Sequence, residues 1–324
     1  LVDLQINGAY GANFSEAAPA EVVRAAERLA AEGVTAFLPT LISLPLPKLE
    51  AALGRLAEAA RSGRGARVAG VHVEGPFLSA ARRGAHRAAN LRRPSVREFE
   101  RLWAASQGLL RVLTLAPELP GAGAVIAAAR RRGVLVSLGH SDAGAAEFSR
   151  AAAAGARLVT HLFNAMAPFH HREEGAAGAA LTDDRLACGL IFDGNHVGPR
   201  AAALALRAKG PDGLFLVSDA VFALGLRSGR YNADGTDYTL SGGRFRVRGG
   251  PLGGAVRSLR WCVANLAREL RLPLASAWRL GSETPGRLLG GGLGVLSPGA
   301  PADLALVGPD GAVRAAWVGG TRWK

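Results

Sequence analysis

The sequence predicts an α/β protein, specifically a (β/α)8 TIM-type barrel, on the basis of three observations. Eight apolar, β-branched runs recur in the first 221 residues, stretches rich in Ala, Leu, Glu and Arg separate most of them, and several of these stretches end in glycine. Alternating strands and helices are typical of a parallel barrel, and glycine commonly terminates a helix. A length of 324 residues with 49% hydrophobic content is enough to bury a core of that size.

The expected strands lie at intervals that leave room for a helix after most of them. They span residues 1–7, 34–43, 66–75, 110–118, 133–140, 156–166, 186–194 and 214–221. The helical stretches include 19–33, 45–63, 123–133 and 143–155.

The pattern changes after residue 221. Residues 228–250 are glycine-rich with short alternating runs, which predicts hairpins or a long loop, whereas 256–270 and 275–290 predict two helices. The tail, 293–320, indicates short strands with tight turns. We expect the barrel to occupy residues 1–290 and a small β-domain to use residues 291–324. Because a β-layer usually needs three or more strands, we expect a β-sandwich whose N-terminal strands are missing from this chain.

Charge and cysteine content restrict the partners and the compartment. The formal net charge is +13, but the arginines are scattered through Ala/Gly/Arg-rich stretches and aromatic residues make up only 6%, which argues against a nucleic-acid partner. No apolar run approaches the roughly 20 residues of a membrane span, so we expect no membrane partner. Cys188 and Cys262 have no Cys or His at metal-finger spacing, and two cysteines suit buried thiols in a cytoplasmic protein.

Polar residues end several of the expected strands, and a barrel carries its active site at the C-terminal ends of its strands. Glu74, His140 and His161 end the third, fifth and sixth strands. One carboxylate and two imidazoles supply three ligands for a metal such as zinc and leave a position open for water. Asp219 ends the eighth strand, where a carboxylate facing that water could act as general base and then as general acid.

Other polar residues near strand ends have simpler interpretations. His72 lies two residues before Glu74, so it shares one side of the strand, a layer deeper, and we expect support or packing ahead of direct metal binding. His170 and His171 lie in a polar loop, where solvated histidines are usual. Asp142 and Asp193 adjoin turns, which favours turn or capping roles.

Several strings, in their order and spacing, resemble the N-acetylglucosamine-6-phosphate deacetylases of the amidohydrolase superfamily. They are HVEGPFLSAARRGAH, TLAPE, SLGHSDA, THLFNAM, REEG, DGNHV and VSDAV, and the resemblance runs from Leu1 to the ADLALV tail. It implies a homodimeric, metal-dependent hydrolase that converts N-acetyl-D-glucosamine 6-phosphate to D-glucosamine 6-phosphate and acetate. Such a reaction belongs to amino-sugar catabolism and cell-wall recycling.

The resemblance also implies roles for individual residues. Glu74, His140 and His161 look like the metal ligands, Asp219 like the acid-base residue, and His86 like the residue that binds and polarises the acetyl carbonyl. The residues implied in substrate binding are Ala85, His86, Asn164, Ala165, Arg172, His196, Leu252, Gly253 and Gly254. In dimers of the family, the residues matching Arg172 or His196 can be supplied across the subunit interface.

The chain departs from wider superfamily patterns in two places. Gln5-Ile6-Asn7 stands where many amidohydrolases have His-x-His, and amides are weak metal ligands. We therefore expect one divalent metal per chain, zinc first, with iron, cobalt or manganese as alternatives. Glu174 stands where the family often has proline, which bears on the loop after Arg172.

Three other interpretations remain open. A related amidohydrolase could deacetylate a different N-acetyl amino sugar, although Arg172 and His196 favour a phosphorylated one. A catalytically silent barrel acting as a binding protein would be expected to lose its ligand set, yet Glu74, His140 and His161 are all present. A nucleic-acid binder would show salt-sensitive retention on DNA.

Overall fold

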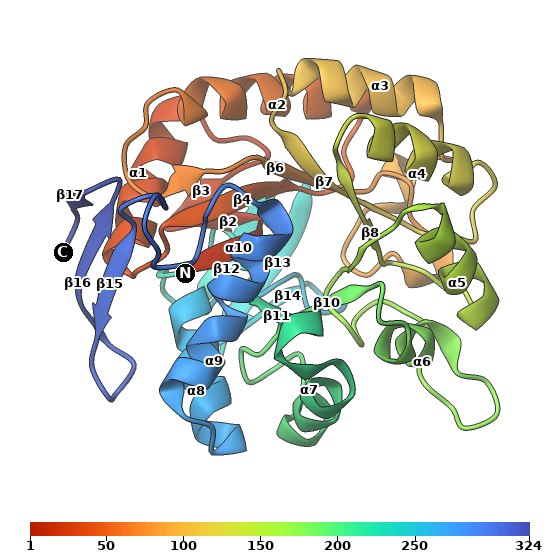
Figure 1. The fold of residues 1–324 in the computed structure, drawn as a ribbon. Helices are drawn as coiled ribbons and strands as arrows, with labels where there is room; N and C mark the ends of the chain where they lie inside the picture. Colours follow the sequence, from red (N-terminus) through yellow and green to blue (C-terminus); the bar gives the residue numbers. More distant parts are fainter.

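The computed structural model describes residues 1–324, and its central feature is a ring of eight parallel strands (Figure 1). Between the last and the first strand, the Asp219 N–H donates to the Gln5 carbonyl at 2.8 Å and the Asn7 N–H donates to the Ala220 carbonyl at 2.7 Å. These bonds confirm the predicted barrel. In ring order the strands are β1 (Val2–Ile6), β4 (Ala36–Leu41), β6 (Val71–Glu74), β7 (Leu110–Leu115), β8 (Leu135–Leu138), β9 (Leu158–Val159), β10 (Ala187–Ile191) and β11 (Leu214–Val217).

Helices pack around the outside of the ring, as Figure 1 shows. Their buried faces are made mainly of Ala, Leu, Val and Phe, which fits the amphipathic spacing of the sequence. The helices are α1 (Pro19–Ala31), α2 (Leu46–Ala60), α3 (Val96–Ala105), α4 (Ala122–Arg131), α5 (Ala145–Ala154), α6 (Gly175–Thr182), α7 (Pro199–Gly213), α8 (Leu259–Leu270), α9 (Leu274–Leu280) and α10 (Glu283–Leu289).

The barrel interior divides into an apolar lower part and a polar upper part. Along β7, Val112 belongs to an apolar cluster with residues of β1, β4 and β11, while its neighbour Leu113 packs in the larger cluster beneath the helices. Thr114, next on the inner side, is polar and fully buried. The strands therefore bury hydrophobic side chains low in the barrel and present polar ones near their C-terminal ends.

Three small antiparallel sheets complete the fold. A two-stranded one follows β1 and comprises β2 (Gly8–Ala9) and β3 (Ala12–Asn13), and β12 (Gly229–Ala233), β13 (Thr236–Ser241) and β14 (Arg244–Val247) form a second. The third, β15 (Leu304–Val307), β16 (Val313–Val318) and β17 (Thr321–Arg322), lies beside α1 at the edge of the molecule (Figure 1). The domain boundary between residues 290 and 291 stays a prediction.

Three predicted elements have the wrong extent. The run 66–75 is divided into β5 (Arg67–Val68) and β6, with Gly70 at φ +151° between them. The run 156–166 contains only two strand residues, because His161, Phe163 and Ala165 all have positive φ and leave the extended conformation. The helix expected over 275–290 is two helices that meet at Gly281.

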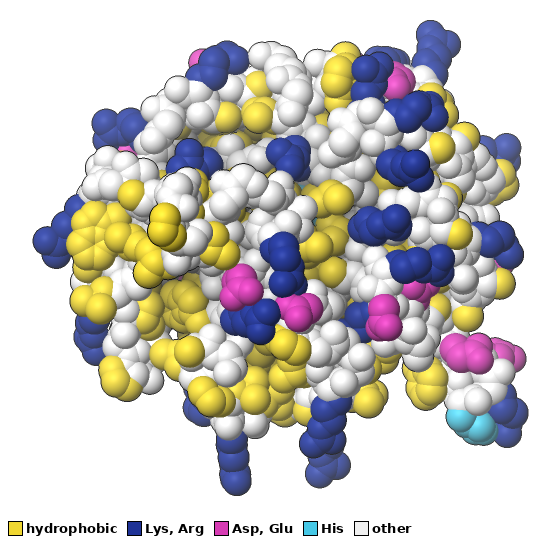
Figure 2. Space-filling model, in the orientation of Figure 1, with side chains coloured by type: hydrophobic (Ala, Val, Ile, Leu, Met, Phe, Trp, Pro, Cys, Tyr) yellow, Lys and Arg dark blue, Asp and Glu magenta, His cyan; other side chains and the backbone are white.

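Figure 2 shows Lys and Arg side chains spread over the visible face, with acidic and hydrophobic side chains between them. None of the helices combines the length and the hydropathy that crossing a membrane requires.

Candidate active site

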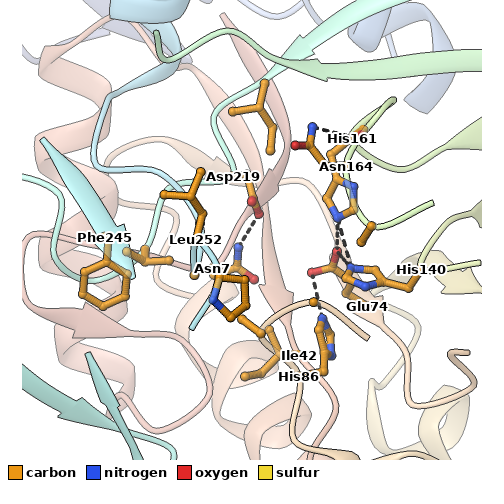
Figure 3. Close-up of a pocket in the computed structure, with 18 of the residues that line it drawn as sticks. Asn7, Ile42, Glu74, His86, His140, His161, Asn164, Asp219, Phe245 and Leu252 are labelled. Carbon is orange, nitrogen blue, oxygen red and sulfur yellow. Dashed lines mark hydrogen bonds and ion pairs between the residues drawn. The ribbon is translucent and has the colours of Figure 1, made fainter. Parts of the chain in front are cut away.

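A cavity of about 450 Å³ opens at the C-terminal ends of the barrel strands (Figure 3). One wall carries titratable side chains from β6 and from the segments after β8, β9 and β11. The opposite wall is formed partly by the β12–β14 sheet, where Tyr238 and Phe245 stack with ring centroids 4.6 Å apart. The cavity thus lies between the C-terminal ends of the barrel strands and the β12–β14 sheet.

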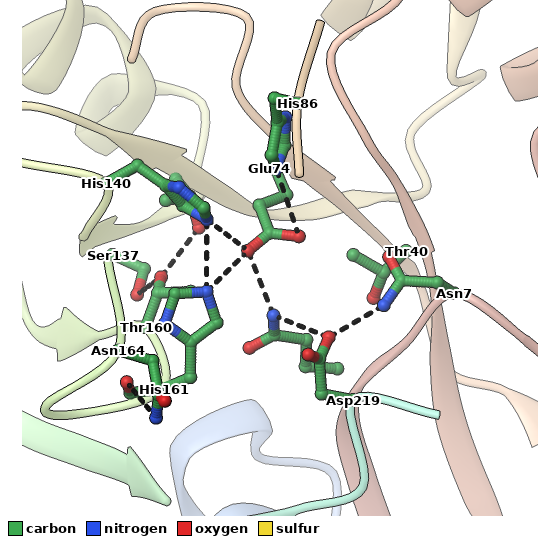
Figure 4. A network of polar contacts seen from close by, with 12 residues as sticks. Asn7, Thr40, Glu74, His86, Ser137, His140, Thr160, His161, Asn164 and Asp219 are labelled. Carbon is green, nitrogen blue, oxygen red and sulfur yellow. Dashed lines mark hydrogen bonds and ion pairs between the residues drawn. The ribbon is translucent and has the colours of Figure 1, made fainter. Parts of the chain in front are cut away.

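Glu74, His140 and His161 converge in this cavity, as Figure 4 shows. Glu74 Oε1 lies 3.1 Å from His140 Nε2 and 3.0 Å from His161 Nε2, and the two Nε2 atoms are 3.1 Å apart. Burial alone would raise the pKa of Glu74, but the two histidines beside its carboxylate hold this pKa well below its usual range. Three buried donor atoms therefore face a single point.

The chemistry of this donor set fits a divalent metal. His140 Nδ1 lies 3.0 Å from the carbonyl oxygen of Arg82, which can only accept, so Nδ1 carries the proton and Nε2 presents a lone pair. A carboxylate and two imidazole nitrogens are ligands that zinc prefers. Three such atoms so close together repel one another unless protons or a shared cation lie between them.

Asp219 lies beside the donor set, held by two amides. Its Oδ1 accepts from Asn7 Nδ2 at 2.7 Å and from Gln5 Nε2 at 3.1 Å, and Gln5 Nε2 is also 3.0 Å from Glu74 Oε1. Burial, together with the negative charge of Glu74, raises the pKa of Asp219 to about 6. A carboxylate with this pKa can both take and return a proton near neutral pH.

His86 presents a donor to the cavity. Its Nδ1 accepts from the Ser43 N–H at 3.2 Å and lies 2.9 Å from the Ser43 hydroxyl. Burial, and then the proximity of His140, lowers the pKa of His86 to about 3, so the ring is neutral and its proton is on Nε2. Nε2 faces Glu74 Oε2 at 3.9 Å, which places an N–H donor next to the predicted metal ligands.

His196 is oriented by Asp193. His196 Nδ1 lies 3.0 Å from Asp193 Oδ2, while Asp193 Oδ1 accepts from the backbone N–H groups of Asn195 and His196 at 2.9 Å. Burial would raise the pKa of Asp193, but these bonds hold it at about 2. Asp193 therefore performs the turn role expected for it and also aims His196 at the cavity that it lines.

Most of the residues that the sequence predicted for substrate binding line the cavity. They are Ala85, His86, Asn164, Ala165, His196, Leu252, Gly253 and Gly254. Arg172 does not line the cavity of its own chain: it is exposed, in the loop before α6. The assignment of Arg172 to the substrate site therefore requires a second subunit, because a single chain does not bring this side chain to its own cavity.

Sequence reasoning missed several cavity residues. Arg82 lines the cavity and fixes His140 through its carbonyl, while its side chain pairs with Asp142 at 2.7 Å. Asn13 and Asp234 bond to each other at 2.9 Å on the far wall. The only signal for Asn13 was its position shortly after the first strand, and nothing in the sequence indicated that residues 228–250 would reach the barrel mouth.

Comparisons with known proteins show the family of the chain independently of the site geometry. The amidohydrolase family pattern matches residues 1–322. A bovine N-acetylglucosamine-6-phosphate deacetylase is 40% identical, over 99% of this chain and 81% of that protein. An N-acetylgalactosamine-6-phosphate deacetylase from Escherichia coli O157:H7 is 36% identical, over 98% of this chain and 85% of that protein.

Solved structures show the same likeness. A mutant of the Mycobacterium smegmatis N-acetyl-D-glucosamine-6-phosphate deacetylase, in complex with N-acetyl-D-glucosamine-6-phosphate, has a TM-score of 0.95 at 34% identity, covering 99% of this chain and 85% of that one. An enamidase matches with a TM-score of 0.59 at 15% identity and covers all of this chain and 80% of that one. The enamidase shares the fold alone.

Proposed function

The chain belongs to the amidohydrolase family, and from this premise we propose that it hydrolyses the acetamide of N-acetyl-D-glucosamine 6-phosphate, giving D-glucosamine 6-phosphate and acetate. One observation carries the proposal. A metal-type donor set, an acid-base carboxylate and a neutral histidine donor meet in one cavity large enough for a phosphorylated sugar.

Glu74, His140 and His161 would hold one divalent cation, zinc in our proposal, with iron, cobalt or manganese as alternatives. When bound, the cation supplies Lewis acidity next to the acetyl carbonyl and makes water a better nucleophile near neutral pH. An amide is a poor electrophile, so this activation is needed.

Asp219 performs both proton transfers. It accepts a proton from the attacking water and then delivers that proton to the departing amine, which leaves only when protonated. The two amide donors of Gln5 and Asn7 hold the carboxylate in one orientation throughout.

His86 donates its Nε2–H to the carbonyl oxygen of the acetyl group. Because the Ser43 N–H occupies Nδ1, the ring keeps the tautomer in which this donor faces the cavity. A fixed donor aimed at the developing oxyanion lowers the barrier without reorganisation.

The phosphate needs cationic donors, and a single chain offers few of them at the cavity. Arg82 is the only arginine that lines it, and that side chain is paired with Asp142. We infer a homodimer in which two residues bind the phosphate together: His196 of the chain that holds the cavity, and Arg172 of the partner subunit. Asn164 and Ala165, with the segment Leu252–Gly254, line the rest of the sugar site.

A second substrate has support from the relative that acts on N-acetylgalactosamine 6-phosphate. The two sugars differ in the orientation of one hydroxyl. The deciding experiment measures acetate release from each phosphorylated sugar, and from unphosphorylated N-acetylglucosamine, with metal-stripped enzyme before and after addition of one equivalent of zinc. No activity on any of them in either state would refute the proposed function.

A further inference from the structure

A chain of hydrogen-bonded side chains lies in the barrel interior next to the proposed metal ligands. Figure 4 shows the end of it that Ser137 and Thr160 form. Ser137 Oγ lies 2.6 Å from Thr160 Oγ1, which lies 2.7 Å from Thr114 Oγ1, and Thr114 Oγ1 lies 2.7 Å from His72 Nε2. His72 Nδ1 is 3.2 Å from the carbonyl oxygen of Leu4. All four side chains belong to residues that are at least 97% buried.

The Leu4 carbonyl at one end of this series of hydrogen bonds determines which atom donates and which accepts in every bond of the series. A carbonyl oxygen can only accept, so His72 Nδ1 carries a proton and donates to Leu4. Both neighbours of the ring are neutral oxygens, so the neutral tautomer is the one that satisfies them, and Nε2 must accept from Thr114. Each hydroxyl has one proton, and therefore Thr160 donates to Thr114 and Ser137 donates to Thr160.

The chain connects the strands that carry the ligands. His72 lies two residues before Glu74 on β6, Ser137 lies on β8 before His140, and Thr160 directly precedes His161. Through Leu4 the chain also reaches β1, one residue before Gln5. A displacement of any of these strands would break a buried hydrogen bond and leave a buried polar group without a partner, which is unfavourable.

The backbone shows that this arrangement is built into the site. A Cβ atom on Gly139 would lie 2.7 Å from Thr160 Cβ and 3.2 Å from its Oγ1, so only glycine leaves room for Thr160 there. The next residue, His140, has φ +49°, and His161 has φ +29°. Non-glycine residues adopt such conformations at an energetic cost and need surrounding structure to hold them.

We propose that the chain Ser137–Thr160–Thr114–His72 is a positioning device that holds Glu74, His140 and His161 at metal-binding geometry and so sets the affinity of the site. None of its members lines the cavity. The inference rests on the metal site of the proposed function, but it does not depend on which sugar is hydrolysed.

Replacement of Thr160 by Val tests the proposal, because it keeps the side-chain shape and removes the only group that both donates to Thr114 and accepts from Ser137. The dissociation constant for Zn²⁺ is measured on metal-stripped protein by competition with a chromogenic chelator, and the electronic spectrum of the Co²⁺-loaded protein reports ligand geometry. We expect Thr160→Val to weaken Zn²⁺ binding about 10–100-fold and to change the Co²⁺ spectrum. Thr160→Ser keeps the hydroxyl, so its Zn²⁺ affinity should lie within about threefold of that of the parent. Its Co²⁺ spectrum should match the parent spectrum.

Thr284→Val is the matched control. Thr284 is fully buried and donates to the Pro211 carbonyl at 2.8 Å, far along the chain from the ligands. This variant should lose thermal stability while keeping the parent Zn²⁺ affinity. If Thr160→Val proves unfolded, Thr114→Val interrupts the chain one step further on. A folded Thr160→Val or Thr114→Val variant that binds Zn²⁺ as the parent does would overturn the proposal. The proposal about the sugar substrate would not be affected by that result.

Discussion

The side-chain amide of Asn7 donates a hydrogen bond of 2.7 Å to Asp219, so the residue that follows the first barrel strand fixes a carboxylate that lies just after the last one. The two strands are neighbours where the barrel closes, and Gln5 bonds to the same oxygen. Two amides from the start of the barrel therefore hold Asp219, and one of them, that of Gln5, also contacts Glu74 of the proposed metal centre.

Asp219→Asn should lower kcat for acetate release by about 10²–10⁴-fold, because an amide cannot accept and return a proton. KM should change little, since the carboxylate acts on water and the amine. Metal content measured on the same preparation serves as the control, as Asp219 is outside the predicted ligand set. An active Asp219→Asn enzyme would exclude Asp219 as the acid-base residue.

His86→Ala should lower kcat by about 10²–10³-fold, the usual effect of losing one fixed donor to an oxyanion. KM for the sugar phosphate should rise much less than kcat falls. Steady-state kinetics at saturating zinc checks both constants. The assignment fails if kcat stays within about threefold of the parent.

Arg172→Ala should raise KM for the phosphorylated sugar about 10–100-fold and leave kcat nearly unchanged, because it removes a charge-assisted hydrogen bond worth about 1.5–3 kcal/mol. Arg150→Ala is a matched control, since Arg150 is exposed and bonds only Glu147 on its own helix.

Mixing tests whether Arg172 acts across a dimer. Arg172→Ala chains retain Asp219, and Asp219→Asn chains retain Arg172, so a mixed dimer contains one intact site when the arginine crosses the interface. We expect co-refolded mixtures to combine the low KM of the parent with a kcat far above that of Asp219→Asn, a combination that neither variant shows alone. Mixtures that form mixed dimers yet show only the activities of the separate variants would place Arg172 at the site of its own chain.

Metal analysis should find close to one divalent ion per chain. Gln5 Nε2 is 3.0 Å from Glu74 Oε1 and 3.1 Å from Asp219 Oδ1, so the amide is engaged as a donor at the place where other amidohydrolases have a second pair of histidines. A chelator should abolish activity, and one equivalent of zinc should restore it. A stoichiometry near two would contradict this account of the amide pair.

The Asp193–His196 pair should make part of the folding stability dependent on pH. The carboxyl group has a pKa of about 2 in the folded chain against an ordinary value of 3.8, a difference worth about 2 kcal/mol. This contribution is present above about pH 4 and is lost as the pH falls towards 2, because the unfolded state then binds the proton first. Urea denaturation should show that Asp193→Asn destabilises the chain at pH 7 and about half as much at pH 3. An equal loss at both pH values would contradict the prediction.

Much of the fold could be predicted because a barrel repeats one pattern eight times. β6 ends at Glu74 as predicted, whereas β8 and β11 end two residues before His140 and Asp219. The barrel still brings these side chains together, because all of them follow strands at the same end of the ring. The extent of the sixth run was wrong because residues after Val159 are apolar enough for a strand, while positive φ values at His161 and Phe163 turn the chain into a loop.

The limits at the site have a physical cause as well. A sequence shows which residues end strands, but not which distant loop covers the barrel mouth, so Tyr238 and Phe245 were not predicted as a cavity wall. Arg172 is a similar case, because spacing along one chain does not reveal whether a loop faces its own cavity or a neighbouring molecule. Arg82 was missed because its backbone carbonyl, and not its side chain, orients His140.

His140, His161 and Asp219 all adopt left-handed backbone conformations, with φ of +49°, +29° and +47°. Glycine would fit each of these positions with less strain, but glycine can neither hold a metal nor move a proton. In the proposed mechanism these three residues hold the metal and move the proton, so the backbone strain lies at the positions that the chemistry needs, and glycine there would relieve strain only at the expense of activity.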